Sequence, residues 1–234
     1  MIVCLETSTN ICSVALCNSL GVVAVRESSE NKSHASQLTV FIQELLAQEE
    51  LRAADLDAVA VNMGPGSYTG LRIGVSTAKG IAYAASIPLI GVETSLSMYY
   101  GIDETIRRKY GTDETSLFIP MIDARRMEVY YSILTSEGRI VKGISAEIID
   151  DGTFRDIPES VRLLIFGDGA SKCKQVINRA NVEFADEFRM SAGFMYKPAY
   201  KSLREKRFED VAYFEPFYLK DFITSRPKKN ILGR

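Results

Sequence analysis

Apolar and polar positions follow two different periods along the first half of the chain. Short apolar runs between polar turns predict β-strands, whereas apolar positions that recur every three or four residues predict helices. On this basis we expect strands at 2–6, 12–17, 22–26, 58–62 and 88–92, and helices at 35–48, at 71–85 and from 94 onward. This order of elements predicts an α/β unit.

The second half repeats the order. After a highly charged segment at 103–116, we expect strands at 117–122, 128–134, 139–142 and 163–166, and helices at 170–178 and 201–210. An acidic residue follows the first strand of each half, Glu6 in one and Asp123 in the other. We therefore predict two related α/β lobes, each with its own mixed sheet and flanking helices. Their bounds are 1–102 for the N-terminal lobe, 103–220 for the C-terminal lobe and 221–234 for a basic tail.

A glycine-rich loop joins the predicted strand at 58–62 to the predicted helix at 71–85. The residues of interest in it are Gly64, Pro65, Gly66, Ser67, Thr69, Gly70 and Arg72. Ser67 or Thr69 can cap the helix, whose free N–H groups would then face a pocket of the size of an anion. The glycine spacing matches neither the nucleotide P-loop nor the dinucleotide fingerprint. A purely structural strand-to-helix turn is therefore the alternative.

The composition is that of an ordinary globular protein, with 46% hydrophobic residues among 234 and a net charge of −2. This balance gives no global electrostatic attraction to nucleic acid. No apolar run approaches the roughly 18 residues that a membrane span requires, and no secretion signal is apparent. We therefore expect a cytoplasmic protein with no membrane association. The 4 cysteines form no Cys-x-x-Cys pair and His34 is the only histidine, so we expect reduced thiols and no metal site.

Two such lobes resemble the duplicated, ribonuclease H-like fold shared by actin, Hsp70 and sugar kinases, in which ATP lies between the lobes. Those nucleotide binders follow the acidic residue with a glycine turn that holds phosphate. Here neither Glu6 nor Asp123 is followed by such a glycine. The turn that contains Gly167 and Gly169 suits either contact with an adenosine or a plain strand-to-helix turn. These four positions indicate a degraded nucleotide site.

Six stretches resemble one family, in order over most of the chain. They are LETSTNICSVAL (5–16), SHASQLTVFIQELL (33–46), MGPGSYTGLRIGVSTAKGIA (63–82), PLIGVETSL (88–96), IDARRMEVYYSIL (122–134) and PFYLK (216–220). The chain is similar to the TsaB (YeaZ) family, bacterial subunits needed to make threonylcarbamoyladenosine in tRNA. That family resembles its catalytic partner TsaD, whose relatives were long labelled glycoproteases of the peptidase M22 type.

The resemblance implies a non-catalytic subunit that pairs with TsaD and works with the ATPase TsaE on tRNA. ATP and metal are then expected on the partner subunits, and no cofactor is expected on this chain. TsaD carries a His-x-x-x-His metal pair, whose places here are Thr94 and Met98, and neither side chain replaces an imidazole ligand. The glycoprotease label has no support, because a single histidine far from any partner provides no Ser–His–Asp set. The alternative is an ATP-dependent small-molecule kinase of the same fold.

The two helices before and after the glycine loop carry more small and apolar positions than one core contact needs. These positions are Leu38, Phe41, Ile42, Leu45, Gly74, Ala78, Ala82 and Ala85. We predict a four-helix contact there with TsaD, or with a second copy of the chain when TsaD is absent. The alternative is that this face packs on the chain's own sheet. We expect the glycine loop and Arg72 to shape the surface near the partner's active site.

Overall fold

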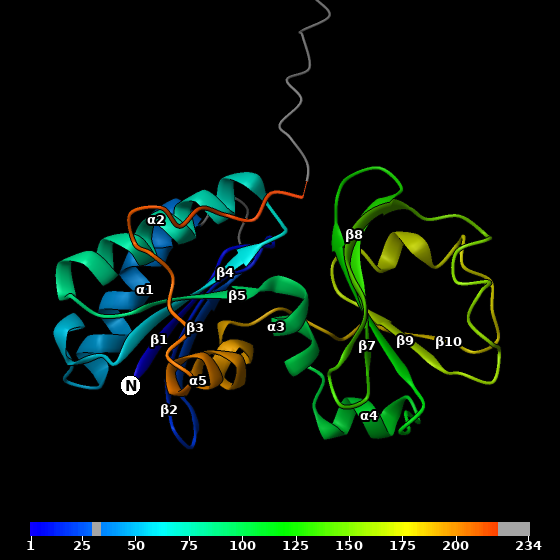
Figure 1. The fold of residues 1–234 in the computed structure, drawn as a ribbon, viewed down its shortest axis with the longest axis horizontal. Helices are drawn as coiled ribbons and strands as arrows, with labels where there is room; N and C mark the ends of the chain where they lie inside the picture. The colour runs from blue at the N-terminus through cyan, green and yellow to red at the C-terminus, as the bar shows by residue number, and fades with distance from the viewer. Residues whose placement is uncertain (30–33, 220–234) are drawn as a thin grey trace, which may run out of the picture.

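The computed structural model describes residues 1–29 and 34–219 and has two lobes that lie side by side (Figure 1). Each lobe contains a five-stranded mixed sheet, so the predicted fold class is confirmed. The predicted basic tail at 221–234 lies outside the described residues. No helix in the described ranges has both the length and the apolar character that a bilayer span needs.

The sheet of the first lobe has the strand order β3-β2-β1-β4-β5. Its strands are β1 (Ile2–Glu6), β2 (Cys12–Asn18), β3 (Gly21–Ser28), β4 (Ala58–Gly64) and β5 (Leu89–Glu93). β1, β2 and β3 pair antiparallel, whereas β1, β4 and β5 run parallel. Parallel neighbours require a crossover connection, and α1 (His34–Gln48) with η1 (Ala53–Asp55) and α2 (Tyr68–Ala85) provide the two crossovers.

Side chains of successive residues in β1 point to opposite faces of this sheet. Val3 and Leu5 belong to the core beneath α1 and α2, whereas Ile2 and Cys4 belong to the core on the other face. The second of these cores also contains residues of η3 (Ala192–Met195) and α5 (Tyr196–Arg204). The chain from Ala192 onward therefore packs on the first sheet, although the sequence places it with the second lobe.

The second sheet repeats the first, with the order β10-β9-β6-β7-β8. Its strands are β6 (Leu117–Asp123), β7 (Glu128–Thr135), β8 (Ile140–Ile148), β9 (Leu163–Phe166) and β10 (Val182–Ala185). β6, β7 and β8 are antiparallel, and β6, β9 and β10 are parallel, as in the first lobe. α3 (Thr94–Tyr100) lies between the lobes, and α4 (Glu104–Lys109) lies within the predicted polar connector (Figure 1).

One predicted helix is absent and another has the wrong bounds. The segment 170–178 contains only the short 3-10 helix η2 (Ser171–Cys173) before β10, a strand that the sequence analysis missed. The charged helix expected at 201–210 begins earlier, as α5, and ends at Arg204. Lys206 has a φ of 53°, so the backbone has left the helical region there.

After α5 the chain crosses the first lobe once more, and we call residues 205–219 the C-terminal strap. Glu209 N–H donates to Leu89 O at 2.9 Å, which covers the free edge of β5. Lys79 Nζ donates to Phe214 O at 2.9 Å, and Phe217 N–H donates to Met63 O at 2.7 Å. The strap thus brings its last residues to the glycine loop, between the lobes (Figure 1).

Candidate functional site

A cavity of about 860 Å³ lies between the two lobes. The turn after β1, the glycine loop with the start of α2, and the turn after β6 supply most of its walls. Asp168, from the turn after β9, completes the wall on the second lobe. The carboxyl ends of β1, β4, β6 and β9 therefore all point to one site, as expected for ligand sites in open α/β sheets.

The turn after β1 is organised by the buried side chain of Glu6. One carboxylate oxygen, Oε1, accepts from Ser8 N–H at 2.7 Å, from Ser8 Oγ at 2.7 Å and from Thr9 N–H at 3.1 Å. The other oxygen, Oε2, accepts from Asn62 Nδ2 in β4. Burial raises the pKa of Glu6, while the hydrogen bonds from Ser8 and Asn62 act in the opposite direction. The backbone N–H groups of Ser8 and Thr9, which a bound phosphate would use, are therefore already paired with the chain's own carboxylate.

The glycines of the loop allow α2 to begin against this turn. A Cβ added at Gly66, Gly70 or Gly74 would lie closer than 3.0 Å to Ser8 O, Thr7 O or Thr7 Oγ1, respectively. Ser67 N–H donates to Ser8 O at 2.7 Å, which fixes the same contact. The close approach of the loop backbone to the turn at Gly66 and Gly70, and of α2 to the Thr7 side chain at Gly74, explains the glycine spacing. This agrees with the alternative of a structural strand-to-helix turn.

The remaining residues of the loop have separate positions. Gly64 has a φ of 117°, and a Cβ there would lie closer than 3.0 Å to Phe217 O of the strap. Pro65, which follows a cis peptide bond, is buried, and Thr69 is exposed at the cavity wall. Ser67 Oγ accepts from Gly70 N–H at 3.2 Å, so of the two predicted N-caps Ser67 is confirmed.

Arg72 is on the exposed side of the first turns of α2, where it connects the helix to the strap. Its guanidinium lies 4.2 Å from the ring centroid of Tyr68, and its Nε donates to Tyr218 Oη at 3.1 Å. The rings of Tyr68 and Tyr218 are 5.0 Å apart at their centroids. These three side chains form a preorganised group beside the cavity.

In the second lobe, Asp123 and Asp168 take the place that Glu6 has in the first. Asp123 Oδ1 accepts from Arg125 N–H at 3.0 Å and is paired with Lys172, while Asp168 Oδ1 accepts from Asp123 N–H at 3.1 Å. Asp168 is open to solvent through the cavity but surrounded by protein atoms, and this desolvation raises its pKa, with a smaller contribution from the charge of Asp123. The carboxylates thus occupy backbone N–H groups in this turn as well.

Gly167 and Gly169 have a packing role. Gly167 has a φ of 108°, and a Cβ there would lie closer than 3.0 Å to Met121 O of β6. A Cβ at Gly169 would lie closer than 3.0 Å to the carbonyl carbon of Ile122. Both glycines therefore let the chain after β9 pass directly against β6. This packing role agrees with the alternative of a plain turn and needs no contact with an adenosine.

The positions that match the metal pair of TsaD are part of the core. Thr94 and Met98 are buried, and the Met98 methyl group packs against Gly167. Within residues 1–29 and 34–219, no three or more His, Cys, Asp or Glu side chains come together as a metal site would require. All four cysteines are free and buried, as predicted.

Sequence reasoning missed several residues of the cavity wall. His34, which begins α1, lines the cavity and is half-buried. Tyr130 and Tyr218 line it as well. The sequence offered no signal that the start of α1, β7 and the strap meet at one cavity.

The predicted helix interface is largely wrong, because most of its residues are covered by the chain itself. The residues buried in the core between α1, α2 and the first sheet are Leu38, Ile42, Leu45, Gly74, Ala78 and Ala82. Phe41 and Ala85 are half-buried. A different stripe of small residues on α2 is exposed, namely Ser76, Gly80 and Ala84. The two stripes are offset by two residues, about 200° around the helix, so they lie on opposite faces of α2, and both have the spacing of four that sequence analysis detects.

A family model described as TsaD, tRNA N6-adenosine threonylcarbamoyltransferase, matches residues 22–153. The tRNA threonylcarbamoyladenosine biosynthesis protein TsaB of Escherichia coli (strain K12) is 36% identical over 131 residues, which cover 56% of this chain and 53% of that protein. TsaB of Bacillus subtilis (strain 168) is 33% identical over 129 residues, 55% of this chain and 52% of that protein. The chain thus spans about half the length of the curated relatives it matches.

The fold is also similar to a solved structure described as YeaZ from Pseudomonas aeruginosa. The TM-score is 0.77 at 22% identity, over 93% of this chain and 99% of that chain. At this identity the likeness concerns the fold alone, and it extends over both lobes.

Proposed function

This chain belongs to the TsaB (YeaZ) family, which is related to TsaD, and from this membership we propose that it is a non-catalytic subunit of a tRNA-modifying complex. It binds and supports a TsaD-like paralogue, which transfers a threonylcarbamoyl group to an adenosine next to the tRNA anticodon. A TsaE-like ATPase completes the complex, and tRNA is bound through the complex as a whole.

The observation that carries the proposal is the pairing of Glu6 with the turn after β1. A nucleotide-dependent enzyme with this fold needs free backbone N–H groups there for phosphate. In this chain Ser8 N–H and Thr9 N–H donate to the Glu6 carboxylate instead. A phosphate would have to displace a buried, hydrogen-bonded carboxylate of the same charge. This supports ATP and metal being held by the partner subunits.

The surface that fits the paralogue is the exposed face of α2 with the adjoining face of α1. Gly80 is exposed in the middle of α2, and a Cβ there would contact nothing within 4 Å. Glycine in a helix interior lowers stability by roughly 1 kcal/mol relative to alanine, and no packing within the described chain explains it. With Ser76 and Ala84 it lets a partner helix approach closely, while Val40 (43% exposed) and Tyr83 (82% exposed) supply apolar area.

The proposed occupant is a helix pair of the TsaD-like paralogue, because a related chain presents equivalent helices to this face. In the absence of that paralogue, a second copy of this chain occupies the face. Heterodimer formation and self-association are then mutually exclusive, and the added paralogue converts one into the other.

Reconstitution tests the proposal. The TsaD-like paralogue, the TsaE-like ATPase, tRNA, ATP and the remaining substrates are combined with and without this chain, and modified nucleoside is measured. We expect modification to fall to background when the chain is omitted, and we expect no transfer by the chain alone. Full modification without the chain would refute the supporting role, and transfer by the chain alone would refute its non-catalytic character.

The alternative of an ATP-dependent small-molecule kinase has less support, because the carboxylates of Glu6 and Asp123 occupy the turns that a kinase would use for phosphate.

A further inference from the structure

The turn between β6 and β7 holds two consecutive arginines in an unfavourable backbone conformation. Arg125 has a φ of 69° and Arg126 a φ of 52°. Side chains other than those of glycine, asparagine and aspartate rarely adopt this left-handed region, because Cβ approaches the following carbonyl oxygen. Asparagine followed by glycine would relax the turn. The arginines are therefore held there at the expense of stability.

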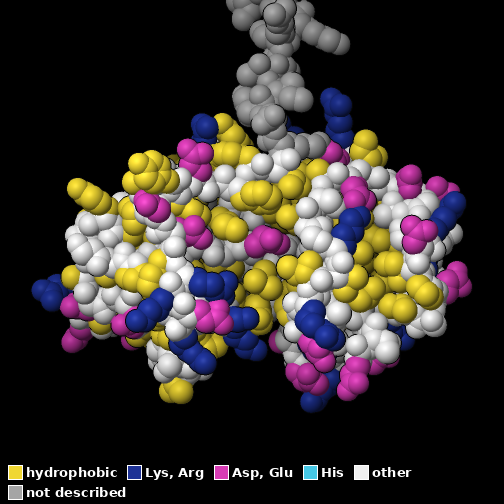
Figure 2. Space-filling model, viewed as in Figure 1, with side chains coloured by type: hydrophobic (Ala, Val, Ile, Leu, Met, Phe, Trp, Pro, Cys, Tyr) yellow, Lys and Arg dark blue, Asp and Glu magenta, His cyan; other side chains and the backbone are white. Residues whose placement is uncertain are grey.

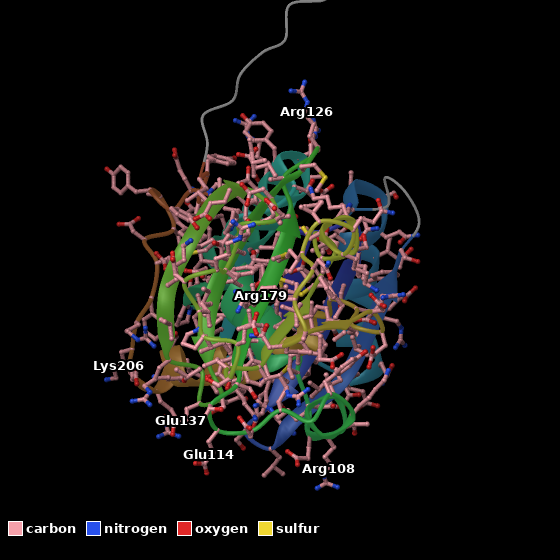
Figure 3. All side chains as sticks on the ribbon, turned by 90° about the vertical axis from the view of Figure 1, so that its right-hand side faces the viewer. Arg108, Glu114, Arg126, Glu137, Arg179 and Lys206 are labelled. Atoms are coloured by element: carbon pink, nitrogen blue, oxygen red, sulfur yellow. The ribbon has the colours of Figure 1, made fainter. Side chains whose placement is uncertain are left out.

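No side-chain interaction within the described chain explains why arginine occupies these two positions. Both side chains are exposed, and in residues 1–29 and 34–219 neither guanidinium has an ion pair or a hydrogen bond. Of Arg125 only the backbone is engaged in the described ranges: its N–H donates to Asp123 Oδ1 at 3.0 Å, and its carbonyl oxygen accepts from Glu128 N–H at 3.2 Å. Arg126 points away from the body of the protein at one end of the molecule (Figure 3). The turn thus presents two charges to something outside the chain.

The first lobe contributes a third cation, Arg72, which contacts two residues of the cavity wall. Arg125, Tyr68 and Tyr218 all line the cavity between the lobes, and Arg72 is held by the two tyrosines. A guanidinium fixed by a ring and a hydroxyl group still has free N–H donors and loses little entropy on binding an anion. The nearby charge of Asp123 is neutralised by Lys172 and does not cancel that of Arg125.

We propose that Arg125 and Arg126, with Arg72 across the cavity mouth, bind the backbone of an unpaired RNA segment. This inference rests on the proposed function, in which the complex acts on tRNA. An arginine turn beside an arginine–tyrosine group is the chemistry of single-stranded nucleic-acid surfaces. Basic and acidic side chains are interspersed over both lobes in Figure 2, with no broad basic face there. The contact is therefore local and adds to binding by the partner subunit.

The test uses a fluorescently labelled RNA stem-loop with an unpaired loop, titrated with the full chain in complex with the TsaD-like paralogue. The variant R125N/R126G replaces the strained arginines by the residues that the backbone favours. We expect about a tenfold loss of RNA affinity, together with a rise in Tm. The slope of log K against log salt should fall in magnitude by about 1.4, because each single-strand phosphate contact contributes about 0.7.

The matched control is the variant K206G/R108Q. It also removes two positive charges, and Lys206 has a φ of 53°, so glycine relaxes that site in the same way. Arg108 and Lys206 lie at the end of the molecule opposite Arg126 (Figure 3). We expect this control to bind the RNA as the wild type does.

Three outcomes would overturn the proposal. The first is unchanged RNA affinity in R125N/R126G, and the second is an equal loss of RNA affinity in the control. The third is an R125N/R126G variant that no longer binds the paralogue but keeps its RNA affinity, which would indicate an acidic protein surface as the ligand. The proposed function fails on a different measurement, since a dispensable chain would leave modification unchanged in the reconstitution whatever the RNA titration shows.

Discussion

Gly66, Gly70 and Gly74 lie four residues apart, so all three face the same side of the loop and of α2. Gly66 and Gly70 meet the backbone of Ser8 and Thr7 on that side, and Gly74 meets the side-chain hydroxyl of Thr7, with no room for a Cβ at any of the three positions. Backbone atoms cannot rotate away as a flexible side chain can. At the scale of single residues, the glycine loop is therefore a packing device that fixes the first helix turn against the first strand turn.

The variant Gly70→Ala tests this packing. Its Cβ would overlap Thr7 O, and we expect the free energy of unfolding to fall by roughly 1–3 kcal/mol. Gly80→Ala is the matched control, because its Cβ meets nothing within 4 Å and alanine favours the helix by roughly 1 kcal/mol. Urea unfolding of both variants measures the difference. A rise in stability for Gly70→Ala would show that α2 does not approach the turn so closely.

Glu6 makes the same turn sensitive to pH. Its pKa in the folded state is raised from the ordinary value of 4.5 by burial, so the folded state binds more protons than the unfolded state between these two values. The stabilising contribution of Glu6 is present below pH 4.5 and is lost as the pH rises through the folded-state pKa.

We therefore expect the wild type to lose stability relative to Glu6→Gln as the pH rises from 4.5 toward neutrality. The glutamine keeps a carbonyl oxygen for Ser8 N–H and Thr9 N–H and carries no titrating charge. Urea midpoints of both proteins over this pH range measure the difference in stability. The other carboxyl groups titrate in both proteins, so their effects cancel in this difference. A constant difference would mean that Glu6 does not titrate differently on folding.

At the scale of helices and sheets, the sequence predicted most elements but not their orientation. α1 and α2 begin within three residues of their predicted positions, because apolar periodicity and the Ser67 cap mark them. The inward face of α2 was misassigned because Ala78 and Ala82 resemble Gly80 and Ala84 in size. A contrast in polarity identifies the buried face of a helix, and small residues on both the buried and the exposed face of α2 give little contrast.

Two arginine substitutions on α2 separate the buried stripe from the exposed one. Ala78 is 0% exposed, so Ala78→Arg buries an unpaired charge, which costs several kcal/mol, and we expect the chain not to fold. Ala84 is exposed, so we expect Ala84→Arg to fold with a stability within about 0.5 kcal/mol of the wild type.

In the folded Ala84→Arg protein, the long charged side chain would lie in the proposed contact with the TsaD-like paralogue. We expect complex formation to be lost in size-exclusion chromatography, while circular dichroism and the urea midpoint stay as in the wild type. A folded Ala84→Arg chain that binds the paralogue normally would place the docking surface elsewhere.

For the whole molecule, the duplication was visible in sequence because the two halves repeat one order of strands and one acidic turn position. The return of residues 192–219 to the first lobe was not visible in the sequence. It depends on which face and which edge of the first sheet the other elements leave exposed. Met195 and Ala199 pack on the first sheet, and the strap pairs with β5. These contacts join residues far apart in the chain, and local periodicity carries no information on them. The contributions of His34, Tyr130 and Tyr218 to the cavity wall escaped prediction for the same reason.

The duplicated turns give a prediction for the whole chain in the presence of nucleotide. Glu6 pairs with Ser8 N–H and Thr9 N–H in one lobe, and Asp123 pairs with Arg125 N–H in the other. A ligand at 100 times its Kd raises the free energy of unfolding by about 2.7 kcal/mol, so a kinase-like site would be detected easily. We expect no change in Tm when the isolated chain is heated with magnesium and ATP. Adenosine is the control for binding that does not involve phosphate, and a Tm that rises with ATP but not with adenosine would favour the kinase over the supporting subunit.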